Sequence, residues 1–282
     1  MEKTKNCVKL AHCICIMCKI CRVMASVLYY FLFLLFTVVC FIPFTLLFLL
    51  TVRFDRERVV LHRASRLWSL GIYHLCPFWK IEVNGREKID RSKPYVIVTN
   101  HQSMLDVPLM YVLPLNFKWV SKREVMKFPI FGWVLRMHGD IAIERGSSSS
   151  ARHMMTMADD YLRRGASVIL FPEGTRTKTG RMGRFKEGGF LMAKSAGVGI
   201  LPVVHDGNYE VLNGWKLRMP HRFRVQVLDP IAPERVMATD VKQLTREVEQ
   251  MMGDLHRQMA PEYYAEEAGS TKSAGVLNEE KK

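Results

Sequence analysis

A histidine and an aspartate five positions apart are the first residues of this sequence that could do chemistry. His101 and Asp106 belong to the run Asn-His-Gln-Ser-Met-Leu-Asp, which follows the apolar residues 95–99. A carboxylate that folds back on an imidazole fixes the tautomer of the ring and leaves the other ring nitrogen free to take a proton from a hydroxyl. The pattern predicts a general base oriented by a carboxylate. In the alternative interpretation, Asp106 caps a helix and His101 is a polar turn residue.

A second polar cluster follows a second apolar run. Residues 167–171 lead into Phe-Pro-Glu-Gly-Thr-Arg, which contains Glu173, Gly174, Thr175 and Arg176. Four further basic residues precede the next acidic one: Lys178, Arg181, Arg184 and Lys186. Guanidinium groups donate paired hydrogen bonds to phosphate oxygens, so this turn predicts a phosphate-binding site. The alternative is a solvated basic loop.

The elements that must position both clusters follow an α/β pattern, in which short apolar runs alternate with amphipathic ones. Several runs are apolar throughout, as is typical of strands buried on both faces of a parallel sheet. We therefore predict a central, mostly parallel sheet covered by helices. The predicted strands are residues 81–83, 95–99, 117–121, 140–143, 167–171, 200–204 and 224–228. The predicted helices are residues 57–76, 149–164, 186–197 and 240–257. Both polar clusters lie at carboxyl ends of strands, where open α/β sheets bind ligands.

A hydrophobic segment precedes this domain. Residues 23–52 contain no charged side chain, and as one helix they would be about 45 Å long, longer than the roughly 30 Å hydrocarbon core of a bilayer. Pro43 interrupts the run, and the flanking segments 1–22 and 53–66 each carry five basic residues. Basic flanks favour the cytoplasmic face. We therefore predict a re-entrant hairpin that attaches the chain to a membrane, with a single span as the alternative.

These features divide the chain into four parts. Residues 1–22 form a basic, cysteine-rich extension, residues 23–52 the membrane-embedded segment, residues 53–260 the catalytic domain, and residues 261–282 a polar tail that we predict to be disordered. Translation can start at Met1 or at Met24, which opens the apolar run.

The cysteines raise the question of a metal site. Five of the seven lie within the first 21 residues, and the spacing of Cys15, Cys18 and Cys21 resembles a metal-binding repeat. A structural zinc site normally draws ligand pairs from two separated segments, and a second pair is missing here. We therefore predict no metal site.

Charge and composition restrict the function classes. The 282 residues carry a formal net charge of +14, and 49% of them are hydrophobic. These values exclude an acidic disordered chain, while 24% charged residues exclude a transporter built mostly of spans. A basic chain needs an anionic partner, which could be nucleic acid, anionic lipid or a phosphorylated substrate. The apolar segment favours lipid, so we predict no nucleic-acid partner.

Other motifs are weaker. Residues 188–195 nearly match a nucleotide P-loop, but Ala193 replaces a required glycine and no strand precedes the run. Residues 193–197 approximate a hydrolase nucleophile elbow but lie inside a predicted helix. The other histidines after residue 52 lack metal-ligand spacing and are assigned structural roles: His62, His74, His138, His153, His205, His221 and His256.

Four runs in order resemble the motif blocks of the glycerolipid acyltransferase family. They are Asn-His-Gln-Ser-Met-Leu-Asp, Gly-Asp-Ile-Ala-Ile-Glu-Arg at 139–145, Phe-Pro-Glu-Gly-Thr-Arg, and Gly-Ile-Leu-Pro-Val-Val at 199–204. The likeness covers about residues 80–230 and is greatest to the bacterial members that acylate 1-acyl-sn-glycerol 3-phosphate. It implies transfer of a fatty acyl group to the free hydroxyl of that lipid, which gives phosphatidic acid. Another lysolipid acceptor is the alternative.

The resemblance also assigns roles to residues. It implies that His101 is the general base and that Asp106 orients it. Lys122, Arg145 and Arg176 match positions in the family's blocks, and we assign them to the acceptor phosphate. Glu173, Gly174 and Thr175 complete the expected substrate-binding turn.

The implied setting is a membrane, most simply a bacterial inner membrane with the catalytic domain on the cytoplasmic face. The expected partners are membrane lipids, lysophosphatidic acid, and acyl-CoA or acyl-carrier protein as co-substrate. No cofactor is expected. Donor choice, chain-length preference and oligomeric state are not encoded in the motifs.

Overall fold

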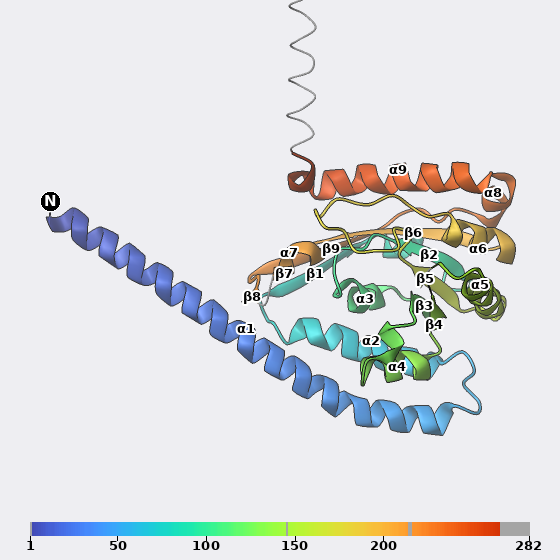
Figure 1. Ribbon diagram of the computed structural model, residues 1–282, viewed down its shortest axis with the longest axis horizontal. Coiled ribbons are helices and arrows are strands. Elements are labelled where there is room, and N and C mark those ends of the chain that lie inside the picture. The colour runs from blue at the N-terminus through green and yellow to red at the C-terminus, as the bar shows by residue number, and fades with distance from the viewer. Residues whose placement is uncertain (1, 145, 214–215, 266–282) are drawn as a thin grey trace, which may run out of the picture.

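The computed structural model describes residues 2–144, 146–213 and 216–265 of the chain (Figure 1). Within that part, seven strands form one sheet in the order β1-β9-β6-β2-β5-β3-β4. Their bounds are β1 Trp79–Asn84, β2 Tyr95–Thr99, β3 Phe117–Lys122, β4 Ile141–Ile143, β5 Ser167–Leu170, β6 Gly199–Asp206 and β9 His221–Val227. Two more strands, β7 Leu212–Asn213 and β8 Lys216–Leu217, pair as a short hairpin.

The sheet is mostly parallel, as predicted. Strands β6, β2, β5, β3 and β4 run in the same direction, whereas β9 pairs with β6 in the antiparallel sense and β1 runs parallel to β9. All seven predicted strands exist, and their ends differ from the prediction by a few residues. The seven-stranded sheet therefore confirms the predicted α/β fold.

Helices cover both faces of the sheet (Figure 1). One face carries α2 Val59–His74, α3 Asp106–Leu109 and α4 Phe131–His138, and the other carries α6 Gly188–Ala196, α8 Pro233–Ala238 and α9 Val241–Met259, with α5 Ser148–Arg163 at the β4 end. Short 3₁₀ turns are η1 Arg86–Lys88, η2 Met110–Val112, η3 Val125–Lys127 and η4 Pro261–Tyr264, and α7 Asn208–Val211 follows β6. The four predicted helices are present, whereas the sequence analysis missed α4 and α8.

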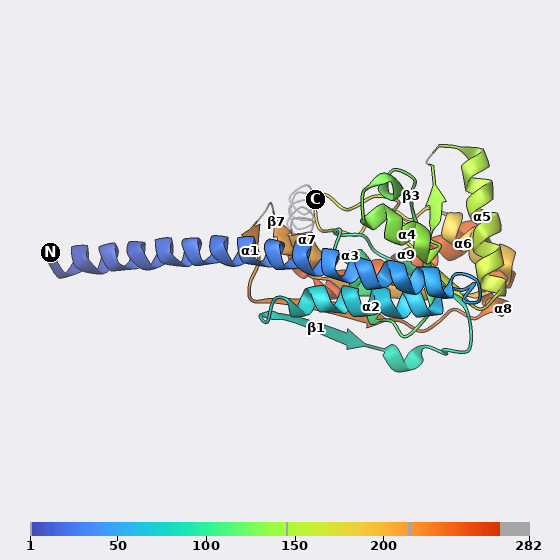
Figure 2. The same cartoon turned by 90° about the horizontal axis from the view of Figure 1, so that it is seen from below.

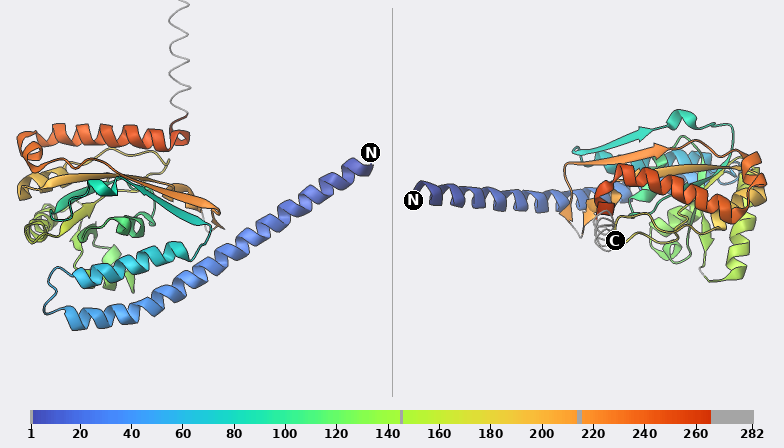
Figure 3. Two further views of the ribbon diagram at one scale, coloured as in Figure 1. Left: turned by 180° about the vertical axis from the view of Figure 1, so that it is seen from behind. Right: turned by 90° about the horizontal axis from the view of Figure 1, so that it is seen from above.

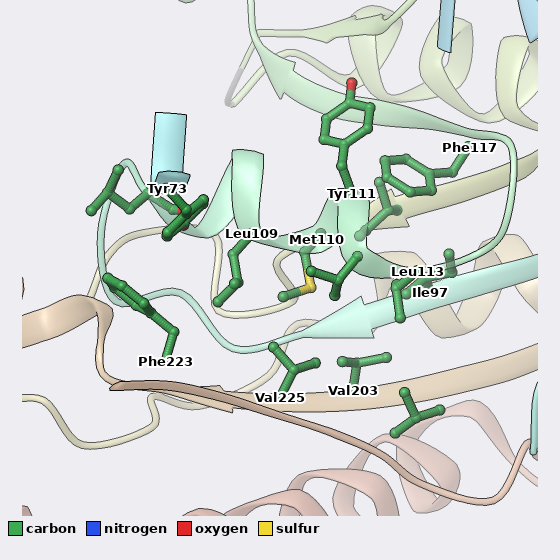
Figure 4. Packing of buried hydrophobic residues seen from close by; sticks show 14 of the residues in the cluster. Tyr73, Ile97, Leu109, Met110, Tyr111, Leu113, Phe117, Val203, Phe223 and Val225 are labelled. Carbon is green, nitrogen blue, oxygen red and sulfur yellow. The ribbon is translucent and has the colours of Figure 1, made fainter. Parts of the chain in front are cut away.

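Two hydrophobic cores result, one on each face of the sheet. Strand β2 supplies both, because Ile97 packs on the α2 and α3 side while Val96 and Val98 pack on the α9 side. On the first side, Leu109 and Met110 lie over Val203 of the sheet (Figure 4). Strand residues buried in alternation on two faces explain why the predicted strands read as continuous apolar runs.

The N-terminal segment differs from the prediction. Residues Glu2–Thr51 form one helix, α1, which passes through Pro43 and bends toward its C-terminal end, so the predicted re-entrant hairpin is wrong (Figure 1). A turn inside an apolar run would leave several backbone groups without partners in lipid, whereas proline removes only one donor from a continuous helix. The side chains of Cys7, Cys13, Cys15 and Cys18 lie outside the described part of α1.

The C-terminal part of helix α1 lies along the domain, whereas its N-terminal part projects beyond it (Figures 1 and 2). The Tyr29 hydroxyl donates to the carbonyl oxygen of Ile72 (3.1 Å), and the indole N–H of Trp68 donates to Thr37 (3.2 Å). The opposite side of α1 is apolar and exposed. Its segment Ile20–Thr51 is long and apolar enough to cross a membrane.

The C-terminal boundary of the domain also differs from the prediction. The structure continues past residue 260 into η4, where the Tyr264 hydroxyl hydrogen-bonds to Nδ1 of His256 (2.9 Å) and accepts from the amide of Met182 (3.1 Å). The domain therefore extends beyond the predicted boundary at residue 260, since Tyr263 and Tyr264 of η4 pack against His256 of α9. Helix α9 lies across one face of the sheet (Figure 3). The rest of the predicted disordered tail, residues 266–282, lies outside the described residues.

Candidate functional site

The carboxyl ends of the five parallel strands meet at one edge of the sheet. Strand β2 pairs with β5 on one side and with β6 on the other, so the loops that follow these three strands are neighbours. The loop after β2 carries His101 and the loop after β5 carries Glu173 to Arg176. The topology thus brings together the two polar clusters that the sequence analysis singled out.

His101 and Asp106 form the predicted pair. Nδ1 of His101 lies 2.7 Å from Oδ2 of Asp106, whose side chain is fully buried, while 17% of the His101 side chain remains exposed. Nε2 of His101 has no hydrogen-bond partner among the described residues. When Nδ1–H donates to the carboxylate, Nε2 of the neutral ring carries no hydrogen and can accept one. The pair therefore presents a basic nitrogen at the edge of the sheet.

Asp106 is held by three further donors. Its Oδ2 accepts the amides of Gln102 (2.6 Å) and Ser103 (2.8 Å), and its Oδ1 accepts the side-chain amide of Asn208 (2.7 Å). These bonds hold the buried carboxylate in a fixed position and satisfy both of its oxygens. The alternative role of Asp106 as a helix cap is wrong, because its oxygens receive amides that precede α3 rather than amides inside the helix.

Asn208 is a site residue that sequence analysis missed. It is fully buried at the start of α7, 102 positions from Asp106 along the chain. The available signal was the polar run His-Asp-Gly-Asn at residues 205–208, which ends β6 at the same edge as the two clusters. No local spacing connects it to Asp106, so only the fold shows the contact.

Glu173 joins the two catalytic loops. Its Oε1 accepts the amide of His101 (2.7 Å) and its Oε2 accepts the amide of Gly183 (2.6 Å). Burial raises the pKa of this carboxyl to about 7, while the two backbone N–H groups act in the opposite direction. Both oxygens are engaged with backbone, so Glu173 holds the loop that carries His101 against the basic loop.

An aromatic surface supports the imidazole. The ring of Phe171 stacks on His101 with 3.8 Å between centroids and 6° between planes, and Trp119 packs on the far side of Phe171 at 5.2 Å. Flat stacking restricts rotation of the imidazole out of the Asp106 hydrogen bond. Phe171 ends the β5 run, so the same strand positions both this ring and the basic loop.

The predicted phosphate ligands are exposed. The side chains of Arg176 and Lys122 make no hydrogen bond or ion pair with another described residue. The amide of Thr177, next to Arg176, donates to the carbonyl oxygen of His101 (2.9 Å). Lys122 ends β3, the strand beside β5. Arg145 lies outside the described residues. Two cations thus lie at the edge that carries His101.

Gly174 and Thr175 shape the turn before Arg176. Gly174 has φ +71°, a left-handed conformation that favours glycine, and the ammonium end of Lys186 lies 2.9 Å from where its Cβ would be. Thr175 is exposed. A residue larger than glycine at 174 would displace Lys186, so this glycine allows a third cation to lie across the turn.

A buried hydrogen-bond network lies behind the site. Asn100 and His205 exchange hydrogen bonds through their side chains and backbone, and the side-chain amide of Gln102 lies between Asp206 (3.3 Å) and Nε2 of His256 (3.1 Å). Burial lowers the pKa of His256 to about 4, so this imidazole is neutral near pH 7. The structural roles assigned to His205 and His256 agree with their burial.

A second histidine and aspartate pair lies inside the domain. Nδ1 of His138 is 2.8 Å from Oδ1 of Asp140, Nε2 of His138 is 3.3 Å from Nδ1 of His62, and the buried ammonium of Lys118 donates to the carbonyl oxygen of His138 (2.8 Å). Both members of the pair are buried. Burial lowers the pKa of His138 and lowers that of His62 to about 2.

The family model described as Acyltransferase matches residues 80–206. A 1-acyl-sn-glycerol-3-phosphate acyltransferase of Pseudomonas aeruginosa is 32% identical over 184 residues, which are 64% of this chain and 71% of that protein. A chloroplastic enzyme of the same name from Arabidopsis thaliana is 38% identical over 173 residues, 60% of this chain. The match spans only about half of that plant protein, 46% of its length.

Among solved structures, the crystal structure of the 1-acyl-sn-glycerophosphate acyltransferase from Thermotoga maritima superposes with a TM-score of 0.69. The superposition covers 86% of this chain and 97% of that one at 23% sequence identity, and it shows a common fold.

Proposed function

The chain belongs to the acyltransferase family, and from that premise we propose that it transfers a fatty acyl group from a thioester to the free hydroxyl of 1-acyl-sn-glycerol 3-phosphate. The product would be phosphatidic acid, a precursor of phospholipids. The names of the bacterial, plant and mammalian relatives support this acceptor. The donor would be acyl-CoA or acyl-carrier protein, as a co-substrate, and the residues of the site supply the chemistry without a resident cofactor.

The observation that carries the proposal is the free Nε2 of His101 opposite a fixed Asp106. The acceptor hydroxyl would donate its proton to Nε2 while its oxygen attacks the thioester carbonyl carbon. The imidazolium that forms is stabilised by the Asp106 carboxylate at 2.7 Å. When the C–S bond breaks, the thiolate takes the proton back from Nε2. No covalent enzyme intermediate is needed, and His101 returns to its starting state.

The exposed cations give the site its preference for a phosphorylated acceptor. Arg176 presents a guanidinium with no competing carboxylate among the described residues, and Lys122 lies at the end of the strand next to β5. We assign both, with Arg145, to the phosphate of the acceptor, because paired N–H donors match its oxygens. Glu173 and Gly174 hold the turn, and Thr175 is free to contact the acceptor.

Attachment to a membrane follows from α1. Between Ser26 and Phe48 one side of this helix contacts the domain, through Leu217, Ile72, Trp68 and Arg58, while the other side is apolar and exposed. A span perpendicular to the bilayer would carry those contacts into the hydrocarbon. We therefore propose that α1 lies along the membrane with its exposed side in the lipid and the domain on the cytoplasmic face, at a bacterial inner membrane.

An acceptor panel tests the reaction. The detergent-solubilised protein would be supplied with labelled lysophosphatidic acid, lysophosphatidylcholine or lysophosphatidylethanolamine, each with acyl-CoA and with acyl-carrier protein. We expect labelled phosphatidic acid from the first acceptor. Product from another lysolipid alone would change the acceptor and keep the acyl transfer, whereas a folded protein that acylates no acceptor would contradict the proposed function.

A further inference from the structure

Large apolar side chains are exposed on the short segment that follows β3. Phe128 is 61% exposed, Trp133 47%, Phe131 43% and Val125 37%. They come from η3, α4 and the turn between these elements. A contiguous group of exposed aromatic side chains is unusual on a water-facing surface and is typical of a surface that meets lipid or another protein. We call residues 122–136 the α4 segment.

The backbone of the α4 segment forces these side chains outward. Gly132 packs against the backbone of Met126, where a Cβ would come within 2.2 Å of the carbonyl oxygen, and its amide donates to the carbonyl oxygen of Phe128 (2.8 Å). The guanidinium of Arg136 also donates to the carbonyl oxygen of Met126. The interior of the turn is thus filled by main chain, which leaves Phe128 and its aromatic neighbours on the outside.

The exposed aromatic group continues the apolar side of α1. Phe131 stacks with Phe33 at 6.4 Å between centroids, and Trp133 packs on Phe41 at 5.9 Å. Helices α1 and α4 both face the viewer when the molecule is seen from the α1 side (Figure 2). The neighbouring part of α1 carries the exposed residues Leu34, Leu35, Val38, Val39 and Ile42. The two elements therefore form one apolar surface.

The charges of the α4 segment indicate which partner this apolar surface contacts. Four basic residues flank the aromatic group, and all four are exposed: Lys122, Arg123, Lys127 and Arg136. The segment contains a single acidic residue, Glu124. Aromatic rings that enter the headgroup region, with lysine and arginine around them, match the surface of an anionic bilayer. A protein partner would have to cover the same face that α1 presents to lipid.

We propose that the α4 segment is a second membrane-binding element, which inserts Phe128, Phe131 and Trp133 into the headgroup region of an anionic bilayer beside α1. Because Lys122 both ends β3 and begins this segment, insertion holds the edge of the sheet that carries His101 against the lipid. An acceptor could then move from the bilayer to His101 without crossing water. This last consequence rests on the proposed function, whereas the membrane contact does not.

Photocrosslinking tests the contact without reference to activity. The photoreactive residue p-benzoylphenylalanine would replace Phe128, with the same replacement at Leu35 on the exposed side of α1 as positive control and at Leu191 on α6, 50% exposed, as negative control. The full chain would be irradiated in phosphatidylglycerol and phosphatidylethanolamine vesicles. We expect lipid adducts at positions 128 and 35 and none at 191. Adducts at 35 alone, or a crosslinked protein dimer at 128, would overturn the proposal.

Kinetics test the consequence. The double variant Phe128→Ser with Trp133→Ser is expected to raise the apparent KM for a long-chain acceptor in vesicles by about tenfold, with kcat for a short-chain soluble acceptor unchanged. The double variant Leu191→Ser with Met237→Ser, also on exposed apolar positions, should change neither. An unchanged KM in vesicles would overturn the role in acceptor delivery. Absence of any activity in the parent protein would reject the proposed function and leave the crosslinking result valid.

Discussion

Two histidine and aspartate pairs of nearly the same geometry lie in this molecule, one at the edge of the sheet and one inside it. The His101 and Asp106 pair is joined through Nδ1 at 2.7 Å, and the His138 and Asp140 pair through Nδ1 at 2.8 Å. They differ at the second ring nitrogen. Nε2 of His101 has no partner among the described residues, whereas Nε2 of His138 is directed at the His62 ring.

This difference teaches that the pair alone does not specify catalysis. His138 is 1% exposed and burial lowers its pKa, so it can neither meet a substrate nor readily hold a proton. The role proposed for His101 depends on its position, because β2 ends two residues before it, at the edge where β5 and β6 also end. We assign the first pair to the proposed chemistry and the second to packing, and each assignment can be tested separately.

The largest expected effect comes from the exposed pair. His101→Ala should lower turnover by a factor of about 10³ or more, because general-base catalysis contributes about 10² to 10⁴ and positioning of the acceptor adds to it. The melting temperature should change less than in His138→Ala, since Asp106 keeps three other hydrogen-bond donors. Steady-state kinetics and thermal unfolding measure both. His153→Ala, at an exposed position of α5, is the matched control; equal activity of the two variants would refute the assignment.

The buried pair should behave in the opposite way. His138→Ala should lower the free energy of unfolding by about 2–4 kcal/mol, because Asp140 would remain buried without its imidazole partner. Turnover per folded molecule should stay within about threefold. Denaturant unfolding and active-site-normalised kinetics separate the two quantities. If turnover falls as far as in His101→Ala while the stability is retained, the contrast between the two pairs is broken.

The sequence predicted the exposed pair because its chemistry is local. Five positions separate His101 from Asp106, and a strand pattern precedes them, so the spacing indicated a contact between the two side chains and the family resemblance assigned their roles. The same holds for Glu173 and Arg176 after β5. His138 was assigned a structural role because it lies just before the motif block that begins at Gly139.

The remainder of the site depends on contacts between distant parts of the chain. Asn208 reaches Asp106 across 102 positions, and His62 reaches His138 across 76, which no local pattern encodes. The hairpin prediction for residues 23–52 failed for a different reason. Pro43 was weighed as a helix breaker, whereas one missing donor is a smaller penalty than a turn with several unpaired backbone groups.

A smaller effect is expected from the cation at the edge. Arg176→Ala should raise the KM for lysophosphatidic acid by roughly 10- to 100-fold, since hydrogen bonds to a charged group contribute about 1.5–3 kcal/mol. kcat should fall much less than in His101→Ala. An uncharged monoacylglycerol acceptor separates the roles, because its acylation should be the same in the variant and the parent. Arg152→Ala on α5 is the control; an equal loss with both acceptors would contradict a phosphate role.

The smallest expected effect is on the pH dependence of the free energy of unfolding. Two groups should contribute with opposite signs: His62, beside the buried pair, and Glu173, beside the exposed pair. Burial lowers the pKa of His62 to about 2 from 6.5, so its contribution to stability is complete above pH 6.5 and is lost as pH falls. Burial raises the pKa of Glu173 to about 7 from 4.5, so its contribution is complete below pH 4.5 and is lost as pH rises toward 7. Between pH 7 and 5.5 the two should change the free energy of unfolding by about 1 kcal/mol each, with opposite signs.

Two variants separate these contributions, which partly cancel in the parent protein. His62→Gln should make the folded state gain stability on acidification relative to the parent, because the histidine no longer opposes Glu173. Glu173→Gln should make it lose stability over the same range, because only the buried histidines then respond. Urea unfolding at pH 5.5 and 7 measures both slopes. Independent groups should give opposite and additive changes in the free energy of unfolding. If both variants change its pH dependence in the same direction, His62 and Glu173 do not titrate independently.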